Sequence, residues 1–154
     1  MTKLKIGDKA PEFNGIDQDG KLISLKDFKC RKLILYFYPK DDTPGCTAEA
    51  CNLRDNYDDL LKKGFAIIGV SADNESSHKN FIAKYVLPFP LIADKDKKII
   101  GIYGVWGEKN LYGKISMGIL RTTFIINEEG VIEKIFTKVN TKNHTQQILE
   151  MKTM

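Results

Sequence analysis

Residues 32–70 read KLILYFYPKDDTPGCTAEACNLRDNYDDLLKKGFAIIGV, and this stretch decides the fold. It opens with a continuous apolar and aromatic run over 32–38, which is typical of a strand buried on both faces. A helical pattern follows over 44–63 and stops at Gly64, and residues 65–70 form a second apolar run. Strand, helix and strand in this order predict a βαβ unit whose two strands are parallel.

The segments on either side of this unit extend it to a single domain over residues 1–154. The further elements that we expect are a β-hairpin around the turn 17–20, a helix over 76–85, an extended segment over 88–92, a β-hairpin over 122–136 and a final helix from about Thr141. This order of elements predicts an α/β protein with a thioredoxin-like fold, in which helices flank a central mixed sheet.

The composition and charge exclude several classes of protein. The chain has 42% apolar and 29% charged residues, as a globular protein does. Its net charge of +4 comes mostly from lysines scattered among acids, so we expect no nucleic-acid partner. The first residues lack the apolar core of a signal peptide, and the longest apolar stretches are too short for a membrane span. We therefore expect a cytoplasmic protein without a membrane partner.

Cys46 lies where the first buried strand passes into the helix. Thr43 is a good N-cap and Pro44 suits the first helical position, which places Cys46 in the first turn. Unpaired backbone N–H groups and the positive end of the helix dipole favour a thiolate there. The Thr43 hydroxyl can donate to the same sulfur, and Gly45 lets a substrate approach closely. The alternative is that Cys46 is a small buried apolar residue.

Two charged residues are candidates for the neighbourhood of this sulfur. Arg121 opens the strand 122–126, and if that strand is antiparallel to 32–38, its guanidinium reaches Cys46. A fixed positive charge there stabilises a thiolate and can hold a peroxide oxygen for attack. Glu49 lies one helical turn after Cys46 and could orient Arg121. The alternatives are an ordinary surface arginine and a solvent-facing acid.

Cys51 is the candidate for a second, resolving thiol. A thiolate that attacks a peroxide becomes a sulfenic acid, and a second thiol converts it to a disulfide. On an ideal helix the Cα atoms of Cys46 and Cys51 lie roughly 8–9 Å apart, whereas a disulfide needs less than about 7 Å. The disulfide therefore requires the start of the helix to unwind. Alternatively, Cys51 packs in the core.

The remaining candidates for metal or redox chemistry are weaker. The spacing of Cys46 and Cys51 does not match zinc ligands, so we expect no metal and no cofactor. His78 and His144 stand in isolated polar contexts and are interpreted as surface residues. There is no Cys-x-x-Cys motif, and Cys30 is interpreted as a turn residue without a role.

At this point the motifs resemble a known family. Pro39, Thr43 and Cys46 have the spacing of the peroxiredoxin active-site motif, and the match extends over nearly the whole chain. The following segments are similar to the bacterioferritin comigratory protein, or peroxiredoxin Q, subfamily: 10–13 (APEF), 47–55 (TAEACNLRD), 104–109 (GVWGEK) and 118–124 (GILRTTF).

The resemblance implies a role for each candidate residue. It makes Cys46 the peroxidatic cysteine and Cys51 the resolving one, with Thr43 and Arg121 as the pair that positions the substrate. Pro39 would shield the pocket, and Glu49 would belong to its hydrogen-bond network. Similar proteins reduce hydrogen peroxide and alkyl hydroperoxides, are often monomeric, and are recycled by thioredoxin. Cys30 departs from the pattern, in which a glycine is usual.

Two alternatives stay open. Cys51 could be a core residue, with an external thiol resolving the sulfenic acid. The protein could also be a redox sensor or holdase rather than an enzyme, if oxidation unwinds the helix and exposes apolar surface to partners.

Overall fold

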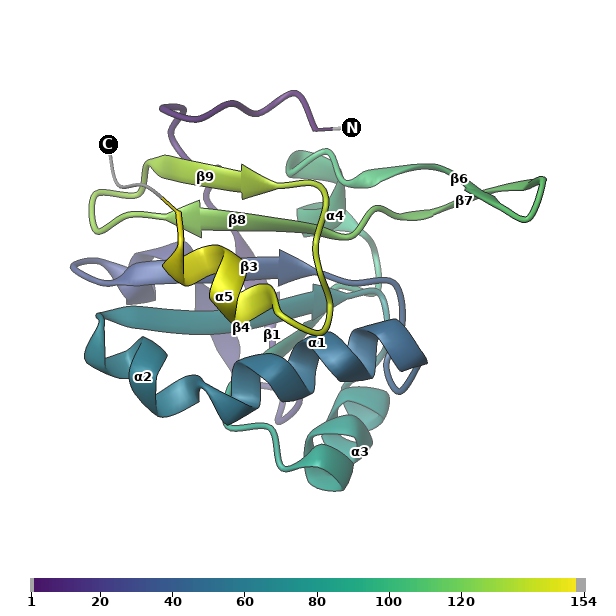
Figure 1. Cartoon of the computed structure of the whole chain (residues 1–154), viewed down its shortest axis with the longest axis horizontal. Helices are drawn as coiled ribbons and strands as arrows, with labels where there is room; N and C mark the ends of the chain where they lie inside the picture. Colours follow the sequence, from purple (N-terminus) through teal and green to yellow (C-terminus); the bar gives the residue numbers. More distant parts are fainter. Residues whose placement is uncertain (1, 152–154) are drawn as a thin grey trace.

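The computed structural model describes residues 2–151, whose central feature is one five-stranded mixed sheet (Figure 1). The strand order is β5-β4-β3-β8-β9, with β3, β4 and β5 parallel and β8 antiparallel to both β3 and β9. The strands are β1 Asn14–Ile16, β2 Leu22–Ser24, β3 Lys32–Phe37, β4 Phe65–Ser71, β5 Leu91–Ala93, β6 Trp106–Leu111, β7 Lys114–Ile119, β8 Thr122–Ile126 and β9 Ile132–Phe136. The helices are α1 Pro44–Asp55, α2 Tyr57–Lys62, α3 Glu75–Tyr85, α4 Lys98–Ile102 and α5 His144–Leu149.

Side chains alternate along β3 and so divide the core into two layers. Leu33, Leu35 and Phe37 pack on one face with α4 and the N-terminal segment. Ile34 and Tyr36 pack on the other face with residues of α1, α2, α3 and α5. Figure 1 shows α1 and α5 together on this second face. The predicted βαβ unit, the N-terminal hairpin and the 122–136 hairpin are confirmed.

Two helix boundaries differ from the prediction. The single helix expected over 44–63 is broken at Asn56, whose side-chain amide donates to the carbonyl of Asn52 and so replaces a backbone bond of the helix. The last helix begins at His144 rather than about Thr141. Asn140 forms a turn there, because its side chain accepts the N–H of Lys142.

The hairpin of β6 and β7 was not predicted from the sequence. It projects beyond the sheet in Figure 1. Its two-residue turn, Tyr112 and Gly113, has φ values of 54° and 80°. Two positive values in succession suit a tight hairpin, and Gly113 was the local signal that could have revealed it. Within residues 2–151, no helix is both long and apolar enough to cross a bilayer.

Candidate active site

Cys46 lies in the first turn of α1, just beyond the carboxyl end of β3. Thr43 is the N-cap, with extended backbone angles of −103° and 157°, and its carbonyl accepts the N–H of Thr47. Pro44 occupies the first helical position, as predicted. The side chain of Cys46 is buried against the apolar layer beneath α1, and the residue is only 1% exposed.

Arg121 brings a positive charge to the sulfur. Its neighbour Thr122 pairs with Phe37, the last residue of β3, so Arg121 stands beside the start of α1. Its Nη2 lies 3.3 Å from Cys46 Sγ. The predicted antiparallel pairing and the predicted position of Arg121 are therefore confirmed.

Gly45 provides the space for this guanidinium. A Cβ at position 45 would lie 3.1 Å from Nη2 of Arg121. The absence of a side chain at Gly45 thus serves the approach of Arg121, in addition to the approach of a substrate that the sequence suggested.

Glu49 orients Arg121 from one turn further along α1. Its Oε1 accepts a hydrogen bond of 2.8 Å from Nη1 of Arg121, and the carboxylate is fully buried. Burial raises the pKa of Glu49 to about 7, although Arg121 opposes the shift. Burial lowers the pKa of Arg121, but the charges of Cys46 and Glu49 and its hydrogen bonds to both outweigh this and raise it. The guanidinium of Arg121 therefore contacts both the sulfur of Cys46 and the carboxylate of Glu49.

His144 lies behind Glu49 and is completely buried, so its interpretation as a surface residue was wrong. Its Nε2 is 2.8 Å from Thr123 Oγ1 and 3.7 Å from Glu49 Oε2. Its Nδ1 faces Gln147 Oε1, which fixes the proton on Nδ1. Burial lowers the pKa of His144. The sequence held no clear signal for this contact, because it depends on how α5 packs against α1.

The hydroxyl of Thr43 does not donate to the sulfur in this structure. Thr43 Oγ1 donates to the carbonyl of Lys40 at 2.8 Å, and a hydroxyl has only one hydrogen to give. The expected bond to Cys46 is therefore wrong for this state. No side chain or N–H of residues 2–151 donates to this oxygen, so it can accept a hydrogen bond from a peroxide.

A cavity of about 360 Å³ borders Arg121. Pro39 lines it together with Leu120 and Thr122, and Lys109 reaches it from β6. Cys46 itself does not line this cavity; Arg121 is the residue that both lines it and contacts the sulfur.

Cys51 lies on α1 as a free, half-buried thiol. It shares one continuous helix with Cys46, so about 7.5 Å of helical rise separates the two residues. The two cysteines are not bonded in this structure.

His78 is also buried, which corrects the second histidine interpreted as a surface residue. Its Nδ1 lies 2.7 Å from Asp41 Oδ2, and its Nε2 faces the carbonyl of Ile92 at 2.9 Å. Asp41, Asp73 and His78 place three potential metal ligand atoms within 4.8 Å of one another. Hydrogen bonds already engage both nitrogens of His78, both oxygens of Asp41 and one oxygen of Asp73, so we interpret the group as structural.

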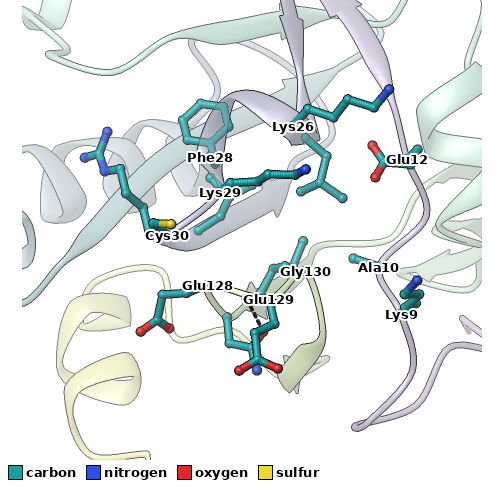
Figure 2. Close-up of a pocket in the computed structure, with 15 residues that line it drawn as sticks. Lys9, Ala10, Glu12, Lys26, Phe28, Lys29, Cys30, Glu128, Glu129 and Gly130 are labelled. Carbon is teal, nitrogen blue, oxygen red and sulfur yellow. Dashed lines mark hydrogen bonds between the residues drawn. The ribbon is translucent and has the colours of Figure 1, made fainter.

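Cys30 lies in the turn before β3, at the end of that central strand opposite to Cys46. Its φ of 70° is a backbone conformation that favours glycine. It borders a second cavity, of about 490 Å³. Figure 2 shows lysines and acids around this cavity, among them Lys29 and Glu128. Charges of both signs select no single class of ligand.

Comparison with known proteins gives the same family throughout. The model of the AhpC/TSA family matches residues 6–135. Peroxiredoxin Bcp of Escherichia coli K12 is 44% identical over 97% of this chain and 96% of its own. A crystal structure of Xylella fastidiosa PrxQ has a TM-score of 0.89 at 30% identity, with 97% and 95% of the two chains covered.

A structure of the Xanthomonas campestris bacterioferritin comigratory protein, described for its alkyl peroxide reduction activity, has a TM-score of 0.85 at 34% identity. It covers 97% of this chain and 95% of that one. With these likenesses and the matching site, the chain belongs to the AhpC/TSA family, as a peroxiredoxin of the Bcp or Q type.

Proposed function

We propose that this thiol-dependent peroxidase reduces hydrogen peroxide and organic hydroperoxides with the sulfur of Cys46. The observation that carries the proposal is the guanidinium of Arg121, which contacts Cys46 Sγ and Glu49 at once. It donates a hydrogen bond to the sulfur and can offer N–H groups to a peroxide oxygen. The free lone pairs of Thr43 Oγ1 can accept the peroxide hydrogen.

The first step oxidises Cys46 by two electrons. The thiolate attacks one peroxide oxygen, an S–O bond forms, and the O–O bond breaks. Cys46 becomes a sulfenic acid, and the leaving oxygen takes a proton to give water or an alcohol.

In the second step we propose that Cys51 resolves the sulfenic acid as a disulfide, with loss of water. The start of α1 must unwind to bring the sulfurs together. The hydrogen bonds of Asn52 support the proposal that the unwinding of α1 stops before this residue. Its side chain donates to the carbonyl of Lys142 and accepts the N–H of Thr145, so the segment that contains α5 holds this point of α1 in place. Unwinding then stays within the turns that precede Asn52.

The third step returns both thiols by thiol–disulfide exchange with a dithiol such as thioredoxin. A reducing compartment, the cytoplasm, supplies such a donor. Cys46, Arg121 and Glu49 all come from one chain, which supports action as a monomer.

The test follows peroxide consumption with thioredoxin and its reductase for the parent, Cys46→Ser and Cys51→Ser. We expect turnover by the parent, none by Cys46→Ser, and a single oxidation without recycling by Cys51→Ser. Mass spectrometry of the parent after one equivalent of peroxide should show loss of both thiols. A Cys51 thiol that stays free would contradict the two-cysteine scheme, and a Cys46→Ser variant that still turns over would contradict the whole proposal.

A further inference from the structure

The cavity beside Arg121 lies next to the residue that contacts the reactive sulfur. Arg121 contacts Cys46 Sγ and also lines the cavity of about 360 Å³. Attack on a peroxide oxygen is in line, so the second oxygen points away from the sulfur. Arg121 contacts the sulfur and lines the cavity, so a leaving oxygen held by its guanidinium would lie near the cavity, and negative charge develops on that oxygen as the O–O bond breaks.

Lys109 reaches this cavity from the projecting hairpin. Gly107 and Gly118 are direct cross-strand partners on β6 and β7. A Cβ on Gly118 would lie 3.3 Å from Cδ of Lys109, and a Cβ on Gly107 would lie 3.1 Å from Cδ1 of Leu120. The two glycines therefore leave room for Lys109 and Leu120 to fold across one face of the hairpin into the cavity.

The ammonium of Lys109 has an unusual electrostatic position. Lys109 is half-buried, and it makes no salt bridge with an acid in the part of the chain that the structure describes. Burial lowers the pKa of Lys109, the charge of Arg121 lowers it further, and the charge of Cys46 partly offsets both. A lysine with a lowered pKa gives up its proton more readily than an exposed one.

We propose that Lys109 is the proton donor to the leaving oxygen when Cys46 is oxidised, an inference that rests on the peroxidase activity proposed above. The thiolate forms the S–O bond, the O–O bond breaks, and the sulfur loses two electrons to the peroxide. The leaving alkoxide or hydroxide takes one proton from the ammonium of Lys109. Neutral Lys109 then regains a proton from water, which its half-exposed side chain can contact.

Arg121 cannot serve this purpose, although it is closer to the sulfur. A guanidinium keeps its proton in proteins, so Arg121 supplies charge but gives up no hydrogen. Lysine can supply both. The two cations of the site thus have separate tasks, one on the sulfur and one on the departing oxygen.

The test compares two oxidants whose leaving groups differ in basicity. tert-Butyl hydroperoxide releases an alkoxide that needs a proton, whereas peracetic acid releases acetate, which is stable as an anion. We expect Lys109→Met to lose roughly 100-fold in the rate of Cys46 oxidation by tert-butyl hydroperoxide, the size of a general-acid effect, and less than about twofold with peracetic acid. Rates are read as loss of the Cys46 thiol in a single turnover, without any reductant.

Two further variants separate proton donation from charge. Lys109→Arg keeps the charge but cannot donate, so it should show the same selective loss as Lys109→Met. Lys114→Met removes an exposed lysine of the same hairpin and should react at the parent rates. Equal losses with both oxidants, or a Lys109→Arg variant at the parent rate, would overturn the inference. A parent protein that reacts with neither oxidant would instead refute the peroxidase proposal.

Discussion

Two buried clusters of polar side chains flank the loop 39–43. One contains Asp41 and His78, and the other, the Cys46 cluster, contains Cys46, Glu49, Arg121 and Tyr36. They differ in how many of their polar atoms have a hydrogen-bond partner. On one side, Asp41 accepts the hydroxyls of Tyr38 and Ser77 and pairs with His78, which is itself bonded to the carbonyl of Ile92. Both oxygens of Asp41 and both nitrogens of His78 are engaged, and one proton lies between the two residues.

On the other side, the Cys46 cluster is left incomplete. Oε2 of Glu49 is buried without a hydrogen-bond partner among the described residues, and so is the hydroxyl of Tyr36. Arg121 is 22% exposed and opens onto a cavity, whereas His78 is completely buried.

This difference separates a structural cluster from a reactive one. A buried network in which every group is satisfied stabilises one conformation and has nothing to offer a ligand. A network with unsatisfied groups and an opening stores unfavourable energy that a substrate or proton can relieve. The Asp41–His78 cluster thus ties the loop to α3, and the Cys46 cluster performs the chemistry.

The largest effect should follow from breaking the satisfied cluster. Asp41→Ala leaves His78 without its buried partner, and we expect a loss of about 3–5 kcal/mol in the free energy of unfolding. Denaturant unfolding of the reduced protein measures this. Asp42→Asn is the matched control, because Asp42 pairs with Lys84 at the surface and should contribute far less. Equal losses in the two variants would contradict the structural role of Asp41.

The next effect concerns rate rather than stability. Arg121→Met removes the guanidinium from Cys46, and we expect the rate of Cys46 oxidation by hydrogen peroxide to fall roughly 100- to 1000-fold. Arg31→Met, at an exposed arginine before β3, should leave the rate unchanged. A rate for Arg121→Met within about twofold of the parent would remove this residue from the mechanism.

The burial of the Glu49 carboxyl can be tested through the pH dependence of the free energy of unfolding. Its pKa is raised from 4.5 to about 7 in the folded protein, so the folded state holds a proton that the unfolded state has released between these pH values. The stability contributed by that proton is therefore present below about pH 4.5 and is lost as the pH rises through about 7.

Glu49→Gln imitates the protonated carboxyl at every pH. It should unfold with nearly the parent's free energy at about pH 5, and at about pH 8 it should be more stable than the parent by roughly 2–3 kcal/mol. Denaturant unfolding at the two pH values measures the difference. A variant that is less stable than the parent at the higher pH would show that Arg121 fully compensates the buried charge.

The sequence predicted the reactive cluster better than the satisfied one, for a physical reason. Cys46 and Glu49 lie one turn apart on a helix, and Arg121 lies beside them through the pairing of two recognisable strands. Local periodicity and strand register brought all three within reach of one another, while a surface arginine and a solvent-facing acid stayed open as alternatives. His78 and His144 were misplaced because each is buried by helix packing, which leaves no periodic trace in its neighbours.

Side-chain competition with the backbone explains the other errors. The side-chain amide of Asn56 donates to the backbone carbonyl of Asn52, and the predicted helix breaks there. The side chain of Asn140 accepts the backbone N–H of Lys142, and α5 begins later than predicted. Thr43 was given one hydrogen-bond partner from its position, but the nearer carbonyl of Lys40 takes its proton. Whether the Thr43 hydroxyl donates to the sulfur of Cys46 or to the carbonyl of Lys40 depends on interatomic distances. The spacing of residues along the sequence does not give those distances.

The smallest expected effect separates the two clusters most directly, because it uses the same chemical change in each. Tyr36 and Tyr38 are both buried tyrosines on the same side of the sheet, with rings stacked 5.4 Å apart. The Tyr38 hydroxyl donates to Asp41 at 2.6 Å, whereas the Tyr36 hydroxyl has no partner among residues 2–151. Burying an unpaired hydroxyl costs free energy, and a bond to a charged group regains it.

Tyr36→Phe should therefore raise the free energy of unfolding by about 1 kcal/mol, and Tyr38→Phe should lower it by about 1.5–3 kcal/mol. Both variants keep the ring and its packing, so the opposite signs would report hydrogen bonding alone. Denaturant unfolding of the reduced protein measures both. If Tyr36→Phe destabilises the protein as Tyr38→Phe does, then the Tyr36 hydroxyl is satisfied in solution, and the contrast between the clusters rests on Glu49 alone.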